Sequence, residues 1–572
     1  MPKLGTWIPL VALLALASSL PFELDQPLAV IGPLTITNVE LLLALALGLA
    51  FTAAPPAQWV RPGRAWWALL LFGGWLLLSA LLAPQFAGNA LKASLRLLTG
   101  VTLAVAVLQM VRQPRHGRLV ALALLGGGVL AAGIGWWEIQ HGELGWVALF
   151  RGRITRVGPF ARLTGPFDYA NQTAMFIEAT LPFVVAGGWH IYHSAWPRWV
   201  KIPLLMGVGV TAVGYLHASV LTLSRASFAT IVIVCLLVAV WLAIPRTAHG
   251  RQMALWWLGL GALAAVITVG HTLLSNQMRL RLQGGNVDEW YQAEVIAPAT
   301  LTIATHSVLD VPVTITNNGS FAWHSDGQNP IQLGARWFNS AGEPIYAELR
   351  WPFPRPVAAG ETVQLRLPLP APPEAGTPEL HWDVVHENVA WFGDRSGRVT
   401  ITQVTAVTSA GQVDAPATPT AVGEHQANGR PSCRPVPSRT TLWRLGLEMV
   451  RERPWLGIGF DNFRLTYGAR LDSTNFDDTV HTNNFYLEML VSVGLLGGGA
   501  FLFWLGALVV DVLQTLHQPD VSIWQAAVGA GLLAFLVHGF LDFFLLFNAT
   551  GLLFWLLVGL WVSEKQLHAY RI

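Results

Sequence analysis

The chain has 572 residues, of which 53% are hydrophobic and only 12% are charged. Soluble proteins carry roughly 25% charged residues, so this composition excludes an ordinary soluble protein and predicts a polytopic membrane protein. The formal net charge of +2 gives no reason to expect nucleic acid as a partner.

Apolar segments long enough to cross a bilayer recur along the chain. A spanning helix needs about 20 apolar residues, and by that measure we count about twelve spans, nine in residues 1–274 and three in residues 483–572. They are centred near Leu13, Leu45, Leu76, Ala104, Gly128, Phe183, Val210, Val234, Ala262, Phe503, Leu533 and Leu556. The first could instead be a signal peptide. A second span follows it directly and we see no convincing small-residue cleavage site, so we retain it as a span.

The distribution of Lys and Arg predicts the orientation. With the N-terminus inside, most inner loops carry the basic residues that the positive-inside rule expects. This topology places residues 275–480 on the outer face. The predicted fold is an all-α polytopic membrane protein with a large outer insertion.

Several arginines violate the positive-inside rule. The loop between the fifth and sixth spans carries four on the outer face, namely Arg151, Arg153, Arg156 and Arg162, and Arg225 follows the seventh span. An anionic ligand would explain them, because guanidinium groups match phosphate oxygens bidentately. Contacts with lipid headgroups, or ion pairs with Glu138 and Glu143, are the alternative. We group Asn171, near the end of the same loop, with these substrate-binding candidates.

The pattern of apolar and polar residues changes between residues 288 and 404. Alternating apolar runs are separated by turn residues, which predicts a β-sandwich of roughly 100 residues. Asn317-Asn318-Gly319 is a hairpin signal, and the tryptophans are expected in the core or at its rim: Trp323, Trp337, Trp351, Trp382 and Trp391. The runs VTITNNGSFAW and WDVVHENVAWFGD resemble the four-tryptophan immunoglobulin-like domain, which implies a binding or spacing role.

Residues 405–437 are rich in Ala, Thr, Pro, Ser and Gly, which is typical of a flexible linker. Residues 438–482 return to order. A helical stripe is predicted there from Leu442, Leu445, Met449 and Val450. Pro454 should end this helix and Gly457 and Gly459 should form a turn.

His481 stands at the mouth of the next span. A surface histidine with a pKa near 6.5 can accept a hydroxyl proton at neutral pH. The plainer interpretation is that it caps the helix or contacts headgroups. The preceding Asp472, Asp477 and Asp478 could bind a metal, but a solvated acidic loop is favoured, and we expect no metal site.

His538 and Asp542 lie one turn apart within an apolar run. Ionisable groups at such depth are costly and often functional. A structural ion pair or a helix-end cap is an equal alternative. The two cysteines, Cys235 and Cys433, occupy different environments, so we expect neither a disulfide nor a cysteine metal site.

Five segments follow one another along the chain in this order: GPFDYANQTAMFIEATLPF, LTLSRASFATIV, SRTTLWRLGLEMVRERPWLGIGFDNF, HTNNFYLEMLVSVGLLGG and HGFLDFFLLFNATGLLFW. Together they resemble the O-antigen ligase and polymerase superfamily of bacterial envelope enzymes. The resemblance implies a multi-pass glycosyltransferase of the GT-C type in the cytoplasmic membrane. Such enzymes act at the outer face on a polyprenyl-diphosphate-linked glycan, without a metal, nucleotide sugar or other cofactor, and the acceptor is a glycan, lipid or protein.

The resemblance also implies roles for single residues. The essential arginines of the family fall on Arg225 and Arg439, which would hold the leaving diphosphate, and the essential histidine falls on His481. Asn484 matches the family's asparagine. The family sets its histidine closer to that asparagine than the spacing found here, and Ser492 stands where an acidic residue is usual.

Other functions stay open at this point. The sequence does not separate a ligase from a polymerase of lipid-linked repeats. A transporter or flippase of lipid-linked sugars would call for polar residues at mid-membrane and repeat symmetry, and a surface-binding scaffold would act through the inserted module. The glycan, the acceptor and the oligomeric state do not follow from the sequence.

Overall fold

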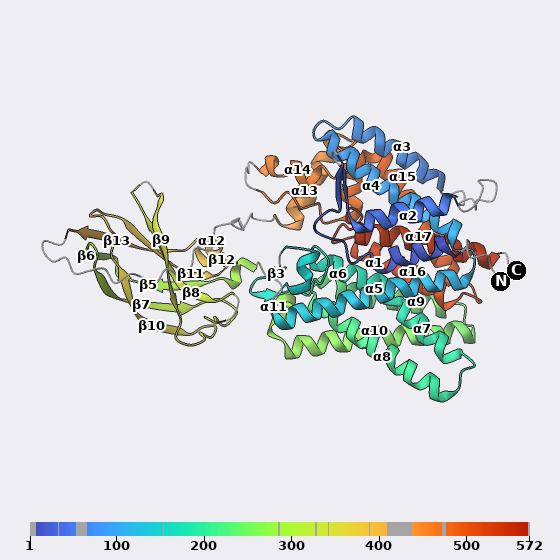
Figure 1. The fold of residues 1–572 in the computed structure, drawn as a ribbon, viewed down its shortest axis with the longest axis horizontal. Helices are drawn as coiled ribbons and strands as arrows, with labels where there is room; N and C mark the ends of the chain where they lie inside the picture. The colour runs from blue at the N-terminus through green and yellow to red at the C-terminus, as the bar shows by residue number, and fades with distance from the viewer. Residues whose placement is uncertain are drawn as a thin grey trace. The chain divides into compact units, whose positions relative to one another are not determined.

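The computed structural model describes residues 7–31, 34–52, 66–142, 144–152, 154–283, 287–326, 329–340, 342–387, 389–408, 437–471 and 476–569. The chain divides into two compact units (Figure 1). The first comprises Met1–Thr155, Ala161–Arg281 and Arg434–Ile572, and the second comprises Arg156–Phe160 and Leu282–Cys433.

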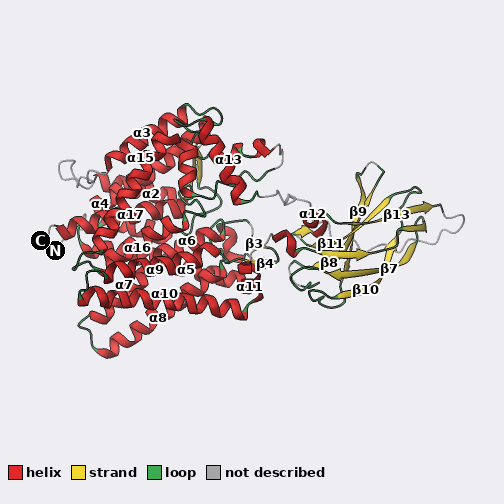
Figure 2. Ribbon diagram, turned by 180° about the vertical axis from the view of Figure 1, so that it is seen from behind, coloured by secondary structure: helices red, strands yellow, loops and turns green. Residues whose placement is uncertain are grey.

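The first unit is a bundle of apolar helices (Figure 2). Its helices before the insertion are α1 Ile8–Ser19, α2 Asn38–Thr52, α3 Trp66–Leu81, α4 Ala87–Met110, α5 Pro114–His141, α6 Ala170–Thr180, α7 Pro182–His193, α8 Arg198–Leu221, α9 Arg225–Ala243, α10 Ala248–Leu274 and α11 Asn276–Gln283. After it come α13 Arg439–Glu452, α14 Phe463–Thr466, α15 Phe485–Leu516, α16 Ile523–His538 and α17 Asn548–Ala569. A short hairpin of this unit is formed by β1 Ala29–Ile31 and β2 Leu34–Ile36. A further hairpin, β3 Arg156–Val157 with β4 Phe160–Ala161, falls largely in the second unit.

The helices bear out a multi-pass membrane protein. Within the described residues, 7 segments are long and apolar enough to span a bilayer, and α1, α2, α3 and α16 are shorter apolar helices. Each centre proposed from the sequence falls within a helix. The number of about twelve crossings stays a prediction, because several of these helices are shorter than the roughly 20 residues that a crossing needs.

The span predicted around Phe183 is broken into two helices. α6 ends at Thr180 and α7 begins at Pro182. Proline lacks the backbone N–H that would continue the helical hydrogen bonds, so a new helix starts at this residue. Nearly every side chain of α6 is buried. Its polar residues therefore lie inside the bundle rather than against lipid.

Helix α15 contains a break near its start. Gly494 has φ +69°, and a Cβ there would lie 2.3 Å from the carbonyl oxygen of Trp455. The turn after α13 fills the break, since Ile458 N and Gly459 N donate to backbone oxygens of α15 and Leu495 N donates to the oxygen of Pro454. Gly457 and Gly459 both have positive φ, as the predicted turn requires.

The second unit is built of two β-sheets. One has the order β10-β7-β5 and the other the order β6-β13-β11-β8-β9, with β12 paired to β11. The strands are β5 Ala293–Ile296, β6 Thr300–Ala304, β7 Val308–Asn317, β8 Ile331–Phe338, β9 Pro344–Pro352, β10 Thr362–Pro370, β11 Glu379–His386, β12 Ala390–Trp391 and β13 Thr400–Val407, and the short helix α12 spans Phe392–Ser396. Trp323, Trp337 and Trp382 are buried, as expected of core residues. An immunoglobulin-like identity and an outer location of this unit stay predictions.

The hairpin predicted at Asn317 is wrong. β7 ends at this residue, but the next strand, β8, belongs to the other sheet. The reason is that buried Asn317 uses its side chain locally: its amide donates to Phe321 O and Val357 O, and its Oδ1 accepts from Gly319 N. The turn therefore crosses between sheets. β13 extends to Val407, past the predicted boundary at residue 404, and residues 409–436 of the predicted linker lie outside the described residues.

Candidate active site

A cavity of about 530 Å³ opens within the helical unit. Loops and helices far apart in sequence contribute to it, which is typical of a substrate site. Its lining residues are Asn89, Lys92, Ala93, Arg96, Asp168, Tyr169, Asn171, Arg439, Asp461, Arg464, Thr479, Val480, His481, Asn483, Asp542, Leu546 and Phe547. Three residues singled out from the sequence, Asn171, Arg439 and His481, thus share one cavity.

Arg439 is positioned by the start of α13. Ser438 caps the helix, and its side chain accepts a hydrogen bond from Thr441 N. The predicted stripe of Leu442, Leu445, Met449 and Val450 is buried and packs on α15, which confirms that prediction. Within the described part of the chain, Nε of Arg439 is buried and has no hydrogen-bond partner. An unpaired buried donor on a cation beside a cavity is suited to an anionic ligand.

His481 is held between two carboxylates. Its side chain is buried, and its Nδ1 lies 3.7 Å from Oε1 of Glu488 and 4.0 Å from Oδ1 of Asp461. These distances exceed a hydrogen bond but permit a strong electrostatic interaction. Glu488 is fixed because its Oε2 accepts a hydrogen bond from Thr482 N at 2.9 Å. One carboxylate oxygen is therefore left facing the imidazole.

The pKa of His481 is raised above its usual value. Burial alone would lower it, but the carboxylates of Glu488 and Asp461 stabilise the imidazolium and outweigh burial. Arg464 opposes this effect from further away. The environment therefore favours a histidine that takes up a proton, as a general base must.

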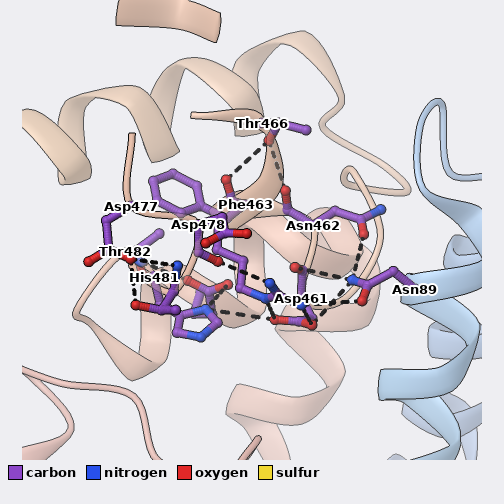
Figure 3. A network of polar contacts seen from close by, with 12 residues as sticks. Asn89, Asp461, Asn462, Phe463, Thr466, Asp477, Asp478, His481 and Thr482 are labelled. Carbon is purple, nitrogen blue, oxygen red and sulfur yellow. Dashed lines mark hydrogen bonds and ion pairs between the residues drawn. The ribbon is translucent and has the colours of Figure 1, made fainter. Parts of the chain in front are cut away.

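Asp461 belongs to a network that fixes its carboxylate (Figure 3). Arg464 donates to both of its oxygens, at 2.7 and 2.9 Å, and Asn89 of α4 donates to Oδ2 at 3.2 Å. Asp461 itself has φ +68°, a left-handed conformation that is unusual outside glycine. Because α4 and the loop after α13 are joined here, the carboxylate beside His481 is immobilised.

A second chain of hydrogen bonds crosses the cavity wall. Arg162 donates to Oδ1 of Asn171 at 2.6 Å, and Asn171 donates to Oδ2 of Asp542 at 2.7 Å. The other oxygen of Asp542 accepts from Phe543 N. The side-chain amide of Asn171 therefore links a guanidinium group to a carboxylate. Its oxygen and its nitrogen are each held in place by one of these two hydrogen bonds.

Four guanidinium groups gather next to the cavity, from Arg162, Arg225, Arg281 and Arg439. Burial, together with repulsion from the other three charges, lowers the pKa of Arg281 to about 9. Burial likewise lowers the pKa of Arg162 to about 10, against the attraction of Asp542. Such a cluster repels itself, so an anion with two or more charges would relieve it.

The other predicted site residues lie elsewhere. Arg151 is buried in an ion pair with Glu138, the alternative considered above, and also donates to Gly165 O. Arg156 donates to Asn329 within the second unit. Neither lines the cavity. Arg153 lies outside the described residues. Asn484 caps α15 by accepting from Leu487 N and donates to Phe540 O, so its amide is committed to structure and the cap is not His481.

His538 and Asp542 do not form the simple pair considered from sequence. Nδ1 of His538 lies 3.0 Å from both oxygens of Glu178 on α6, in a fully buried ion pair. Asp542 faces the cavity. No group of three or more His, Cys, Asp or Glu side chains in the described residues could hold a metal ion, and the Asp472 of the predicted acidic loop lies outside them.

Sequence reasoning missed several polar residues of the site: Asp461, Arg464, Glu488, Asn483 and Arg281. Glu488 was detectable, because it lies one helical turn after the residue that caps α15, and so points back toward His481. Arg281 carried no local signal. Its position depends on the fold, where its Nε donates to Leu223 O beside Arg225.

Comparison with known families adds one finding. A family model described as O-antigen ligase matches residues 402–502. The matched segment supports the O-antigen ligase superfamily. No curated protein matches the chain.

The O-antigen ligase segment contains much of the candidate site. It includes Arg439, Asp461, His481 and Glu488, as well as the break at Gly494. The match supports a membrane enzyme family of the O-antigen ligase and polymerase type, and it gives no support to a transporter. The remaining residues of the cavity lie outside the matched segment, on α4, on α6 and in the loops before α6 and α17.

Proposed function

We propose that this chain transfers a glycan from a polyprenyl diphosphate to an acceptor hydroxyl at the outer face of the cytoplasmic membrane. One observation carries the proposal: a buried histidine between carboxylates and an arginine with an unpaired donor line the same cavity, beside three further guanidinium groups. The first arrangement suits proton removal and the second suits a leaving diphosphate. The family match supports this type of reaction.

The chemistry assigns a step to each group. The acceptor oxygen attacks the anomeric carbon, the bond from that carbon to the diphosphate oxygen breaks, and the acceptor proton passes to His481. Glu488 and Asp461 stabilise the imidazolium that forms. The diphosphate leaves with its charge neutralised by Arg439, Arg225 and Arg162, and such preorganised charge can lower a barrier by several kcal/mol, about 3 per donor.

Asn171 and Asp542 have a positioning role in this scheme. Asp542 limits the repulsion among the guanidinium groups, and Asn171 holds Arg162 in place. Arg225 lies at the first residue of α9, where the helix N-terminus adds to the positive potential. All of these contributions act on the leaving group rather than on the attacking one.

The test is transfer of a labelled polyprenyl-diphosphate glycan by the purified protein in liposomes that contain an envelope acceptor fraction. EDTA is present, because arginines supply the charge in this proposal. Wild type should form product, and His481→Ala and Arg225→Ala should lose it by about 100-fold or more. Arg444→Gln, on the exposed face of α13, is the control and should retain activity. Label that only changes leaflet, with no product, would instead indicate a transporter.

A further inference from the structure

A second cavity, of about 250 Å³, adjoins the first. It is formed by the loop after α1, the β1–β2 hairpin, the loop before α6 and the start of α17. Glu23, Asp25, Gln172 and Phe547 are among its lining residues. Arg96, Asp168, Leu546 and Phe547 line both cavities, so the two are neighbours with a common wall.

The two cavities differ in charge. The first is lined by four cationic side chains, Lys92, Arg96, Arg439 and Arg464, against the three carboxylates of Asp168, Asp461 and Asp542, and the arginine cluster lies beside it. Among the described residues that line the second are the carboxylates of Glu23, Asp25 and Asp168 and one cation, Arg96, which already pairs with Glu40 at 3.1 Å. A phosphate group would therefore meet net negative charge in the second cavity. The diphosphate belongs in the first cavity, and whatever enters the second is not an anion.

The polar groups of the second cavity suit hydroxyl donors. Thr37 and Asn548 both donate to Oε1 of Glu23, and no described residue donates to its Oε2. Buried Gln172 lies across from Asp168, with Nε2 3.5 Å from Oδ2. Carboxylates that accept and amides that donate are the partners that sugar hydroxyls require. Phe150 and Phe547 add flat apolar surfaces, on which the C–H face of a sugar ring can pack.

The position of the second cavity matches an acceptor. The ring of Phe547 borders both cavities, and its centroid lies 6.4 Å from that of His481. A ligand in the second cavity is thus separated from the catalytic base by about one side chain. A volume below the roughly 300 Å³ of typical ligand cavities fits one sugar unit rather than a whole repeat.

We propose that the second cavity is the binding site for the accepting sugar: a neutral, hydroxyl-bearing ring held by Glu23, Asp25 and Gln172 against Phe547, with one hydroxyl directed toward His481. This inference rests on the proposed transfer reaction and adds the chemical class of its acceptor end. It also divides the site, with the lipid diphosphate on the arginine side and the acceptor on the carboxylate side.

The experiment uses the full-length protein in detergent and a panel of methyl hexosides that carry a photoreactive diazirine. Crosslinked positions are mapped by mass spectrometry. We expect label on residues 20–25 and 546–549, lowered by about tenfold in Asp25→Ala and in Gln172→Leu. Asp25→Ala removes an exposed side chain whose backbone contact to Leu149 O is kept, so its folding risk is small. Glu374→Gln, an exposed carboxylate of the second unit, is the control.

A second arm separates the two cavities. Saturating inorganic pyrophosphate should leave the labelling unchanged, and Arg439→Gln should label like wild type. Label that pyrophosphate displaces, that falls elsewhere, or that persists in both cavity variants would overturn the inference. Failure of the transfer assay with label still in the second cavity would instead overturn the proposed function and leave a sugar-binding site.

Discussion

The Nδ1 atom of His481 lies 3.7 Å from Oε1 of Glu488, and neither atom has a hydrogen-bond partner among the described residues. This relationship is electrostatic, and it raises the pKa of the histidine against the effect of burial. If His481 is the general base, as proposed, it is active when deprotonated, so its pKa sets the acidic limb of the rate profile.

Glu488→Gln should therefore lower the pKa of His481 and move the acidic limb of kcat/KM to lower pH. The sign follows because the lost carboxylate favoured the protonated form. The measurement is kcat/KM for transfer between pH 5 and 9, with Glu448→Gln on α13 as the control. A limb that moves to higher pH, or that stays in place, would contradict the assignment of His481 as the base.

Arg439→Gln should weaken binding of the donor. Its Nε is buried without a partner in the described structure, so the lipid diphosphate is expected to supply one. Loss of a charged hydrogen bond costs about 2 kcal/mol, which is about 30-fold in kcat/KM. Transfer kinetics at varied donor concentration measure this loss. Arg444→Gln lies one turn along the same helix with its side chain 67% exposed, and should change kcat/KM by less than about twofold.

Asn171→Leu should uncouple Arg162 from Asp542. The substitution keeps the volume of the side chain but removes the donor and the acceptor that join these two groups. We expect a loss of about tenfold or more in kcat/KM with little change in thermal stability. Combining it with Arg162→Gln should cost less than the sum of the two single changes. Additive losses would show that Asn171 does not act through Arg162.

Gly494→Ala should destabilise the protein. The backbone has φ +69° and the new Cβ would overlap Trp455 O, so α15 and the turn before α14 would have to separate. Positive φ alone costs about 1–3 kcal/mol in a residue other than glycine. Thermal unfolding in detergent measures the effect. Gly499→Ala is the matched control on the same helix, because nothing lies within 4 Å of its Cβ position.

Arg151→Met should affect folding rather than donor binding. The guanidinium is buried against Glu138, and removal of one partner leaves an uncompensated charge that costs about 3–5 kcal/mol. The double variant with Glu138→Gln should recover much of that stability. Protein yield and melting temperature are the readouts. A stable Arg151→Met protein with a raised KM for the donor would instead indicate that Arg151 binds the donor.

The positions of the helices and of the β unit could be predicted from the sequence. Hydropathy located helices because lipid requires apolar surface and internally satisfied backbone, and alternation with turn residues located the β unit. The break at Pro182 was readable from the residue itself. The crossing between sheets at Asn317 was not, because it depends on where a buried amide finds its partners.

The candidate site was predictable only in part. His481, Arg439 and Asn171 were found because each stands at an end of an apolar run or in a motif shared with the family. The positive-inside rule pointed equally to Arg151 and Arg162, and only the tertiary structure separates the one in an ion pair from the one beside the cavity. Asp461 depends on a left-handed backbone and on Asn89, which lies in a distant helix.

The break at Gly494 has a mechanical consequence. Trp75 and Ser79 of α3 donate to backbone oxygens on both sides of the junction between α15 and the turn after α13. Pulling that turn away would strand these carbonyl groups in an apolar setting, at several kcal/mol, about 2 or more for each. These hydrogen bonds therefore hold the segment that carries Arg439 and Asp461 firmly against α3. In the proposed reaction, a bulky lipid-linked substrate would therefore be expected to enter by movement of the opposite wall, formed by the loops before α6 and α17.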